Sequence, residues 1–141
     1  MANLETYLFF DGTCAAAMRF YADTLGGTIE RMMTYAEAPA ASEAPAGADD
    51  RIMHARLELD GHALMASDLP RDDVHKGMHG FSLSLNYPTV DEARSVFDRL
   101  AAGGTISMPL SATFWAEAFG MLTDRFGTSW MINVDKPQAS S

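Results

Sequence analysis

Apolar residues in the first part of the chain recur with two different periods. Residues 4–10 are rich in aromatic side chains, which predicts a strand that ends at the turn signal Asp11-Gly12. From Cys14 to Leu25 the apolar side chains return every three or four residues, as they do on a helix with one buried face. Thr13 is expected to cap this helix, and Gly26-Gly27 is expected to end it.

The following segments predict three more strands and one long loop. A strand is expected over about 28–35, and a hairpin is expected from strands at 52–60 and 62–67. Between these strands, residues 36–50 are nearly all Ala, Pro, Glu, Gly and Ser and show no apolar periodicity. Such a composition predicts a mobile surface loop, and its length makes it a candidate lid.

After a polar linker over 69–78, the same order of elements starts again. A second helix is expected over 90–102, and it ends at Gly103-Gly104 as the first helix ends at a pair of glycines. We therefore interpret the chain as an internal repeat of a strand, a helix and three strands, βαβββ. The strands expected in the second copy are 81–86, 105–108, 114–122 and 128–134.

This repeat predicts an α+β fold in which the 141 residues form a single domain. One helix covers only one face of its sheet, so pairing two βαβββ modules buries the remainder and leaves a concave pocket. The expected parts are module one at about 3–68, the linker at 69–78, module two at about 79–135 and a flexible tail at 136–141.

The net negative charge of the chain is unfavourable for two classes of binding partner, nucleic acids and anionic membranes. Nineteen acidic residues against ten Lys and Arg give a formal charge of −9, which repels nucleic-acid phosphates and anionic membranes. Neither a nucleic acid nor a membrane is therefore expected as a partner. The single Cys14 excludes an internal disulfide, and the first residues show no signal-peptide pattern, so a cytoplasmic location is expected.

Several ordered segments together resemble a known family. The chain resembles the PhnB-like group of the vicinal oxygen chelate superfamily, whose members include glyoxalases, bleomycin-resistance proteins and extradiol dioxygenases. This resemblance implies two paired βαβββ modules that form a curved mixed sheet around a pocket, in a protein that is usually a homodimer. The segments that carry it are 7–21, Leu25-Gly26-Gly27, 52–57, 64–68, Phe114-Trp115 and 123–133.

The resemblance also indicates where a metal would be held. Metal-using relatives place His, Glu or Gln ligands on the first and last strand of each module. By strand order, these positions correspond here to Glu5, Met65, Gly80 and Met131. Only a carboxylate among them suits a hard divalent ion, so no metal and no cofactor are expected. His79 would become a ligand if the alignment of the strand shifted by one residue.

Two polar residues are candidates for chemistry. Glu5 is a candidate general base, or a solvated carboxylate at a sheet edge. His54 alternates with apolar neighbours and shares its strand face with Arg56 and Glu58. This group would bind a polar ligand or transfer protons, or else form a polar ladder on the solvent side or at a dimer contact.

Aromatic and methionine side chains are the candidates for a ligand-binding wall, although such residues are also ordinary core. The predicted wall consists of Tyr7, Phe9, Met65, Trp115, Phe119 and Met131. The sequence thus predicts a metal-free protein that binds a small, partly hydrophobic molecule. The alternatives are a metal-dependent lyase, isomerase or dioxygenase, and a metal-free acid-base enzyme. No glycine-rich loop follows a strand, so a site for a nucleotide-like methyl donor is not expected.

Overall fold

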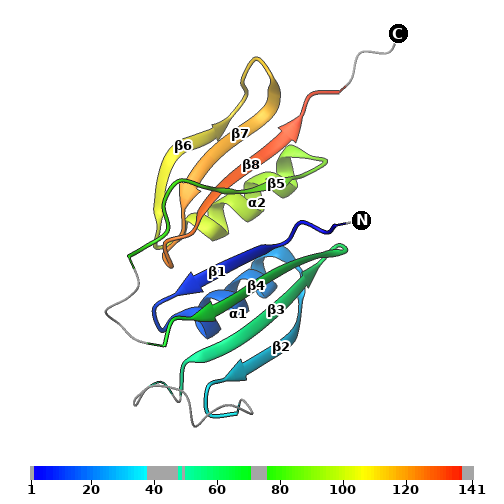
Figure 1. The fold of residues 1–141 in the computed structure, drawn as a ribbon. Coiled ribbons are helices and arrows are strands. Elements are labelled where there is room, and N and C mark those ends of the chain that lie inside the picture. The colour runs from blue at the N-terminus through cyan, green and yellow to red at the C-terminus, as the bar shows by residue number, and fades with distance from the viewer. Residues whose placement is uncertain (1, 38–47, 49, 71–75, 138–141) are drawn as a thin grey trace. The chain divides into compact units, whose positions relative to one another are not determined.

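The computed structural model describes residues 2–37, 48, 50–70 and 76–137, which fall into two compact units, Met1–Gly77 and Met78–Ser141. In the first unit a four-stranded mixed sheet has the order β1-β4-β3-β2, with β1 parallel to β4 and the other neighbours antiparallel (Figure 1). The helix α1 packs against β2, β3 and β4. The elements are β1 Thr6–Phe10, α1 Cys14–Leu25, β2 Thr28–Thr34, β3 Ile52–Leu59 and β4 His62–Asp68.

The second unit repeats this topology. Its sheet has the order β5-β8-β7-β6, again with one parallel pair, β5 and β8, and α2 packs against β6, β7 and β8. The α+β class and the repeated βαβββ order predicted from the sequence are confirmed. The single domain stays a prediction. The elements are β5 Leu83–Asn86, α2 Val90–Ala101, β6 Thr105–Ser111, β7 Ala116–Thr123 and β8 Ser129–Asp135.

The core of each unit lies between its helix and its sheet. On β1 the buried Leu8 and Phe10 alternate with less buried residues, and on β8 the buried Trp130, Ile132 and Val134 alternate with half-buried ones. Each side chain of this kind stabilises the fold by roughly 1.5–3 kcal/mol when it leaves water. The opposite face of each sheet is therefore left to side chains with other roles.

Two local expectations differ from the structure. The strand expected over 114–122 begins only at Ala116. Thr113 N donates to the Ala116 carbonyl and Ala116 N donates to Thr113 Oγ1, which closes a turn that holds Phe114 and Trp115. Thr13 precedes α1 but its side chain makes no capping hydrogen bond, whereas Thr89 Oγ1 accepts one from Glu92 N at the start of α2.

Two further expectations concern parts of the chain outside or between the regular elements. Most of the loop expected at 36–50, and with it the candidate lid, lies outside the described residues, as do the last four residues of the predicted tail.

None of the helices in the described part of the chain is long and apolar enough to cross a membrane.

Candidate functional site

The face of the first sheet that points away from α1 gathers most of the predicted site residues. Tyr7 and Phe9 project there from β1, since their neighbours Leu8 and Phe10 point into the core. Tyr7 pairs with Met65, and Phe9 pairs with Ser67 on β4. We call this surface the first outer face, made of Glu5, Tyr7, Phe9, His54, Arg56, Met65 and Ser67.

An aromatic and imidazole cluster occupies the centre of the first outer face. The Tyr7 hydroxyl lies 3.3 Å from His54 Nδ1, and the two ring centroids are 5.9 Å apart. On its other side, Tyr7 contacts Phe9 at 5.1 Å between centroids. Tyr7 and Phe9 are still 38% and 49% exposed, so both rings offer apolar area for contact. Tyr7, Phe9 and His54 therefore lie on one face of the sheet, and their roles as site residues stay predictions.

Arg56 on this face forms ion pairs with two carboxylates. Arg56 Nε donates to a Glu30 carboxylate oxygen at 3.1 Å, and its Nη1 lies 3.7 Å from a Glu5 carboxylate oxygen. The same Nη1 donates to the Met65 sulfur at 3.6 Å. Glu5, a candidate general base from the sequence, is thus paired with Arg56, while His54 contacts Tyr7. Both residues lie on the first outer face, but in separate contacts.

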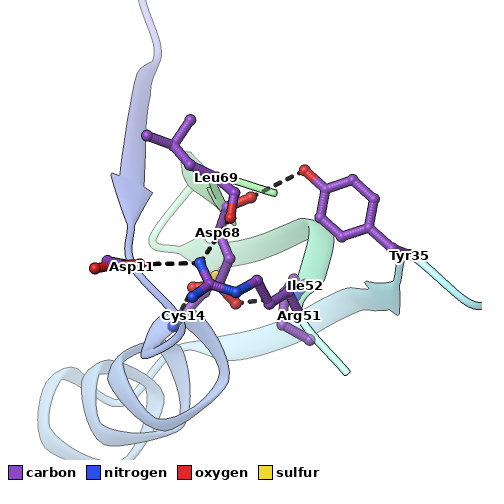
Figure 2. A network of polar contacts seen from close by, with 7 residues as sticks. All are labelled: Asp11, Cys14, Tyr35, Arg51, Ile52, Asp68 and Leu69. Carbon is purple, nitrogen blue, oxygen red and sulfur yellow. Dashed lines mark hydrogen bonds and ion pairs between the residues drawn. The ribbon is translucent and has the colours of Figure 1, made fainter. Parts of the chain in front are cut away.

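A buried carboxylate holds the end of this sheet together (Figure 2). Asp68, 1% exposed, accepts hydrogen bonds from Cys14 N at 3.0 Å and from Ile52 N at 2.9 Å. Its carbonyl oxygen accepts a third from the Tyr35 hydroxyl at 3.0 Å. Asp68 therefore joins the first turn of α1, the start of β3 and the end of β2. It satisfies one of the free N-H groups in the first turn of α1, where the Thr13 side chain makes no capping hydrogen bond.

Three further residues complete this network. Arg51 Nη1 donates both to the Asp11 carboxylate at 3.0 Å and to the Leu69 carbonyl at 2.8 Å (Figure 2). Burial, followed by the nearby Tyr7 and Asp68, raises the pKa of the Tyr35 hydroxyl, while Arg51 opposes this rise. Tyr35 is thus a neutral hydrogen-bond donor close to Tyr7.

Cys14 is expected to be chemically inert in the folded protein. The residue is fully buried, and desolvation followed by the charge of Asp68 raises its thiol pKa to about 12. At pH 8 only about one molecule in ten thousand would carry the reactive thiolate. Iodoacetamide should therefore leave the native protein unmodified by mass spectrometry and add one carbamidomethyl group per chain in guanidinium chloride. Equal labelling rates in both conditions would contradict the buried position.

The three predicted wall residues of module two lie in the second unit. Trp115 is 49% exposed and contacts the ring of Phe119 at 5.5 Å between centroids, while Phe119 itself is 8% exposed. Met131 pairs with Met121 on β7 and with Ser84 on β5, on the face that points away from α2. Trp130, the other aromatic of this segment, is core instead, with its Nε1 donating to Asp124 at 2.8 Å.

The residues at the metal positions do not suit a divalent ion. The carboxylate of Glu5 is paired with Arg56, Met65 and Met131 offer only thioether sulfur, and Gly80 has no side chain. Across the described ranges, which leave out 38–47 and 71–75, no three His, Cys, Asp or Glu side chains gather closely enough to hold a metal. The metal-free character of the protein stays a prediction.

Sequence reasoning missed Ser67 and Tyr35 as members of this region. Ser67 alternates with the buried Ala66 and Asp68, so the strand period was the available signal that it faces outward. Tyr35 follows the end of β2, where the alternation of side chains along a strand no longer indicates which way a side chain points. Its place depends on a hydrogen bond to a residue 33 positions away.

Comparisons with known proteins agree with this fold. The model of the glyoxalase/bleomycin resistance protein/dioxygenase superfamily matches residues 3–132. Protein YjdN of Escherichia coli is 39% identical, with 96% of this chain and 97% of YjdN covered. Among solved structures, protein PA1353 of Pseudomonas aeruginosa has a TM-score of 0.88 and 43% identity over 97% of this chain and 100% of that one.

The PhnB protein of Bacillus cereus is a second structural relative. It has a TM-score of 0.80 and 28% identity, and the match covers 94% of this chain and 99% of that protein. The family match spans most of both units, and the resemblance inferred from the sequence is confirmed. The chain belongs to the glyoxalase/bleomycin resistance protein/dioxygenase superfamily and, within it, to the PhnB-like group.

Proposed function

We propose that this protein is a cytoplasmic homodimer that binds a small, partly hydrophobic molecule on the first outer face without a metal, and so sequesters it. The observation that supports this proposal is the pair of exposed rings, Tyr7 and Phe9, beside the imidazole of His54. Exposed aromatic side chains that lie side by side, next to a directed polar group, are typical of a ligand-binding surface.

Each residue has a distinct role in this proposal. Tyr7, Phe9 and Met65 supply apolar contact, because aromatic rings and a flexible thioether cover a flat ligand at low entropic cost. His54 supplies a hydrogen bond through Nε2, the ring nitrogen that does not contact Tyr7. Glu5 contributes through its ion pair with Arg56. In the second unit, Trp115, Phe119 and Met131 are proposed as ligand contacts of that unit's own sheet, on the face away from α2.

A fragment screen with matched variants tests this site. Compounds that raise the melting temperature of the wild-type protein are expected, and Phe9→Ala should weaken their binding about tenfold, since it removes one of the two exposed rings. Phe20→Ala is the matched control, because it deletes the same ring from α1, which covers the opposite face. Binding would be measured by isothermal titration calorimetry. Equal losses in both variants, or no stabilising compound, would contradict the proposal.

A metal-free acid-base enzyme is the second candidate, and the Tyr7 to His54 contact of 3.3 Å favours it. When the phenol donates to Nδ1, the imidazole proton sits on Nε2, so the pair is able to pass a proton to a bound molecule. Time-resolved NMR of each compound that binds separates the two functions, because only an enzyme converts its ligand. A stoichiometric divalent ion in the purified protein would instead favour a metal-dependent enzyme.

A further inference from the structure

Three methionines from neighbouring strands lie in one row on the face of the second sheet that points away from α2. Met121 on β7 is the direct partner of Met131 on β8 and of Met108 on β6, and these three strands are adjacent in the sheet (Figure 1). Directly paired residues of antiparallel strands project from the same face, with Cβ atoms about 4.5–5.5 Å apart. We call Met108, Met121 and Met131 the methionine row.

The methionine row is not part of the core between α2 and its sheet. Met108 is 39% exposed, and Met121 and Met131 are half-buried, whereas the neighbouring core residues Leu122 and Trp130 are almost fully buried. Packing in the core therefore does not explain why a methionine stands at each of the three positions. The pairing of β6 is also irregular on both sides of Met108, and such bulges often re-aim a side chain next to a functional site.

The surroundings of the methionine row favour a soft ion of low charge. Within the described strands β5, β7 and β8, the side chains paired next to the row on this face carry no charge. A divalent ion would therefore lack the anionic oxygen donors that compensate its charge, whereas thioether sulfur is a soft, neutral ligand that selects Cu(I). These neighbours are Ser84 on β5, Phe119 and Asn133 on one side of the row, and Thr123 and Ser129 on the other.

We infer that the methionine row is a binding site for one soft monovalent metal ion, Cu(I), held by the three thioether sulfurs. Each methionine side chain has three rotatable bonds, so the sulfurs of Met108 and Met131 are able to reach a point above Met121. Phe119 projects from the same face two residues before Met121, and an aromatic ring beside a cation attracts it. This inference concerns the second sheet and goes beyond the proposed function, and it gives Met131 a second role.

Silver ions test the site first, because Ag(I) shares the preference of Cu(I) for thioether sulfur and needs no reductant. The protein is labelled with ¹³C at the methionine methyl groups and titrated with silver nitrate in a buffer without chloride. One equivalent should shift the methyl signals of the methionine row and leave those of Met18 and Met65 in place. The affinity for Cu(I) is then measured under nitrogen with ascorbate, by competition with the chromophoric chelator bicinchoninate.

Two leucine variants show whether the thioethers of the row are the ligands. Met121→Leu nearly conserves the side-chain volume, so the fold should be retained. Its affinity for Cu(I) should fall by at least about tenfold, the smallest loss expected when a metal site loses even a supporting group. Met65→Leu is the matched control and should leave the affinity unchanged, because it removes a half-buried thioether from the outer face of the first sheet.

Three outcomes would overturn the inference. Shifts that spread over many methionines, and only at a large excess of silver, would indicate an adventitious ion only. Equal affinities of Met121→Leu and the wild-type protein would show that the methionine row does not hold the ion. Loss of binding in Cys14→Ala but not in Met121→Leu would assign the ion to the thiol. None of these outcomes bears on the fragment screen with Phe9→Ala, because that screen tests the first outer face.

Discussion

Replacing Asp68 by alanine is expected to lower the free energy of unfolding by about 4 kcal/mol, because two buried N-H groups lose a charged acceptor. The carboxylate accepts from Cys14 N and Ile52 N, and the residue is 1% exposed, so water does not replace it at either donor. The helix start and the β3 start would both be left unsatisfied. Urea denaturation followed by circular dichroism measures the effect.

Asp135→Ala is the matched control for this variant. Asp135 ends β8 as Asp68 ends β4, but it is exposed and accepts from the Asn133 side chain at 2.8 Å. Its removal should cost less than about 0.5 kcal/mol, as surface substitutions do. Similar losses in the two variants would show that Asp68 is not the centre of a buried network.

The regular elements could be predicted because each one has its own local pattern. The α1 boundaries, Cys14–Leu25, follow directly from the apolar spacing and the two glycines that follow. The Asp68 network could not be predicted in this way, since its donors lie 54 and 16 residues away in the sequence. Thr13 has the composition of a helix cap, but the tertiary fold supplies a carboxylate to Cys14 N, and this contact leaves no sequence pattern.

For the candidate site, too, the sequence could predict which side chains share a strand face, but not which strands are neighbours. Alternation shows that Tyr7 and Phe9 share one strand face, and that His54 and Arg56 share another. Their meeting requires the strand order β1-β4-β3, which sets Tyr7 beside Met65 and Arg56 opposite Met65. Register of this kind is a property of the folded sheet. For that reason the sequence could place His54 and Arg56 on one face, but it could not show that Glu5 pairs with Arg56 and His54 with Tyr7.

The paired glycines after each helix show a second limit of local reasoning. Both pairs were read as helix stops, and the first glycine of each pair has the expected left-handed backbone, with φ of 81° at Gly26 and 77° at Gly103. The second glycine has a different role. A Cβ at Gly27 would lie 2.7 Å from the Glu58 carbonyl oxygen, and one at Gly104 would overlap that of Thr123. These two carbonyls occupy equivalent places in the repeat, opposite Thr28 and Thr105.

Gly104→Ala is consequently expected to destabilise the protein by at least about 3 kcal/mol, because overpacking against rigid backbone forces the strand to move. Besides Thr123, the added methyl would lie 2.9 Å from Asp124 Cα, and neither atom belongs to a flexible side chain. Gly103→Ala makes the same change one residue earlier and should cost only about 1 kcal/mol, because its Cβ meets the Arg125 side chain at 3.4 Å and the main penalty is the positive φ. Urea midpoints of the two variants measure the difference. A larger loss in Gly103→Ala would mean that the glycine pair acts only as a helix stop and that the close approach of Gly104 to the end of β7 has no energetic role.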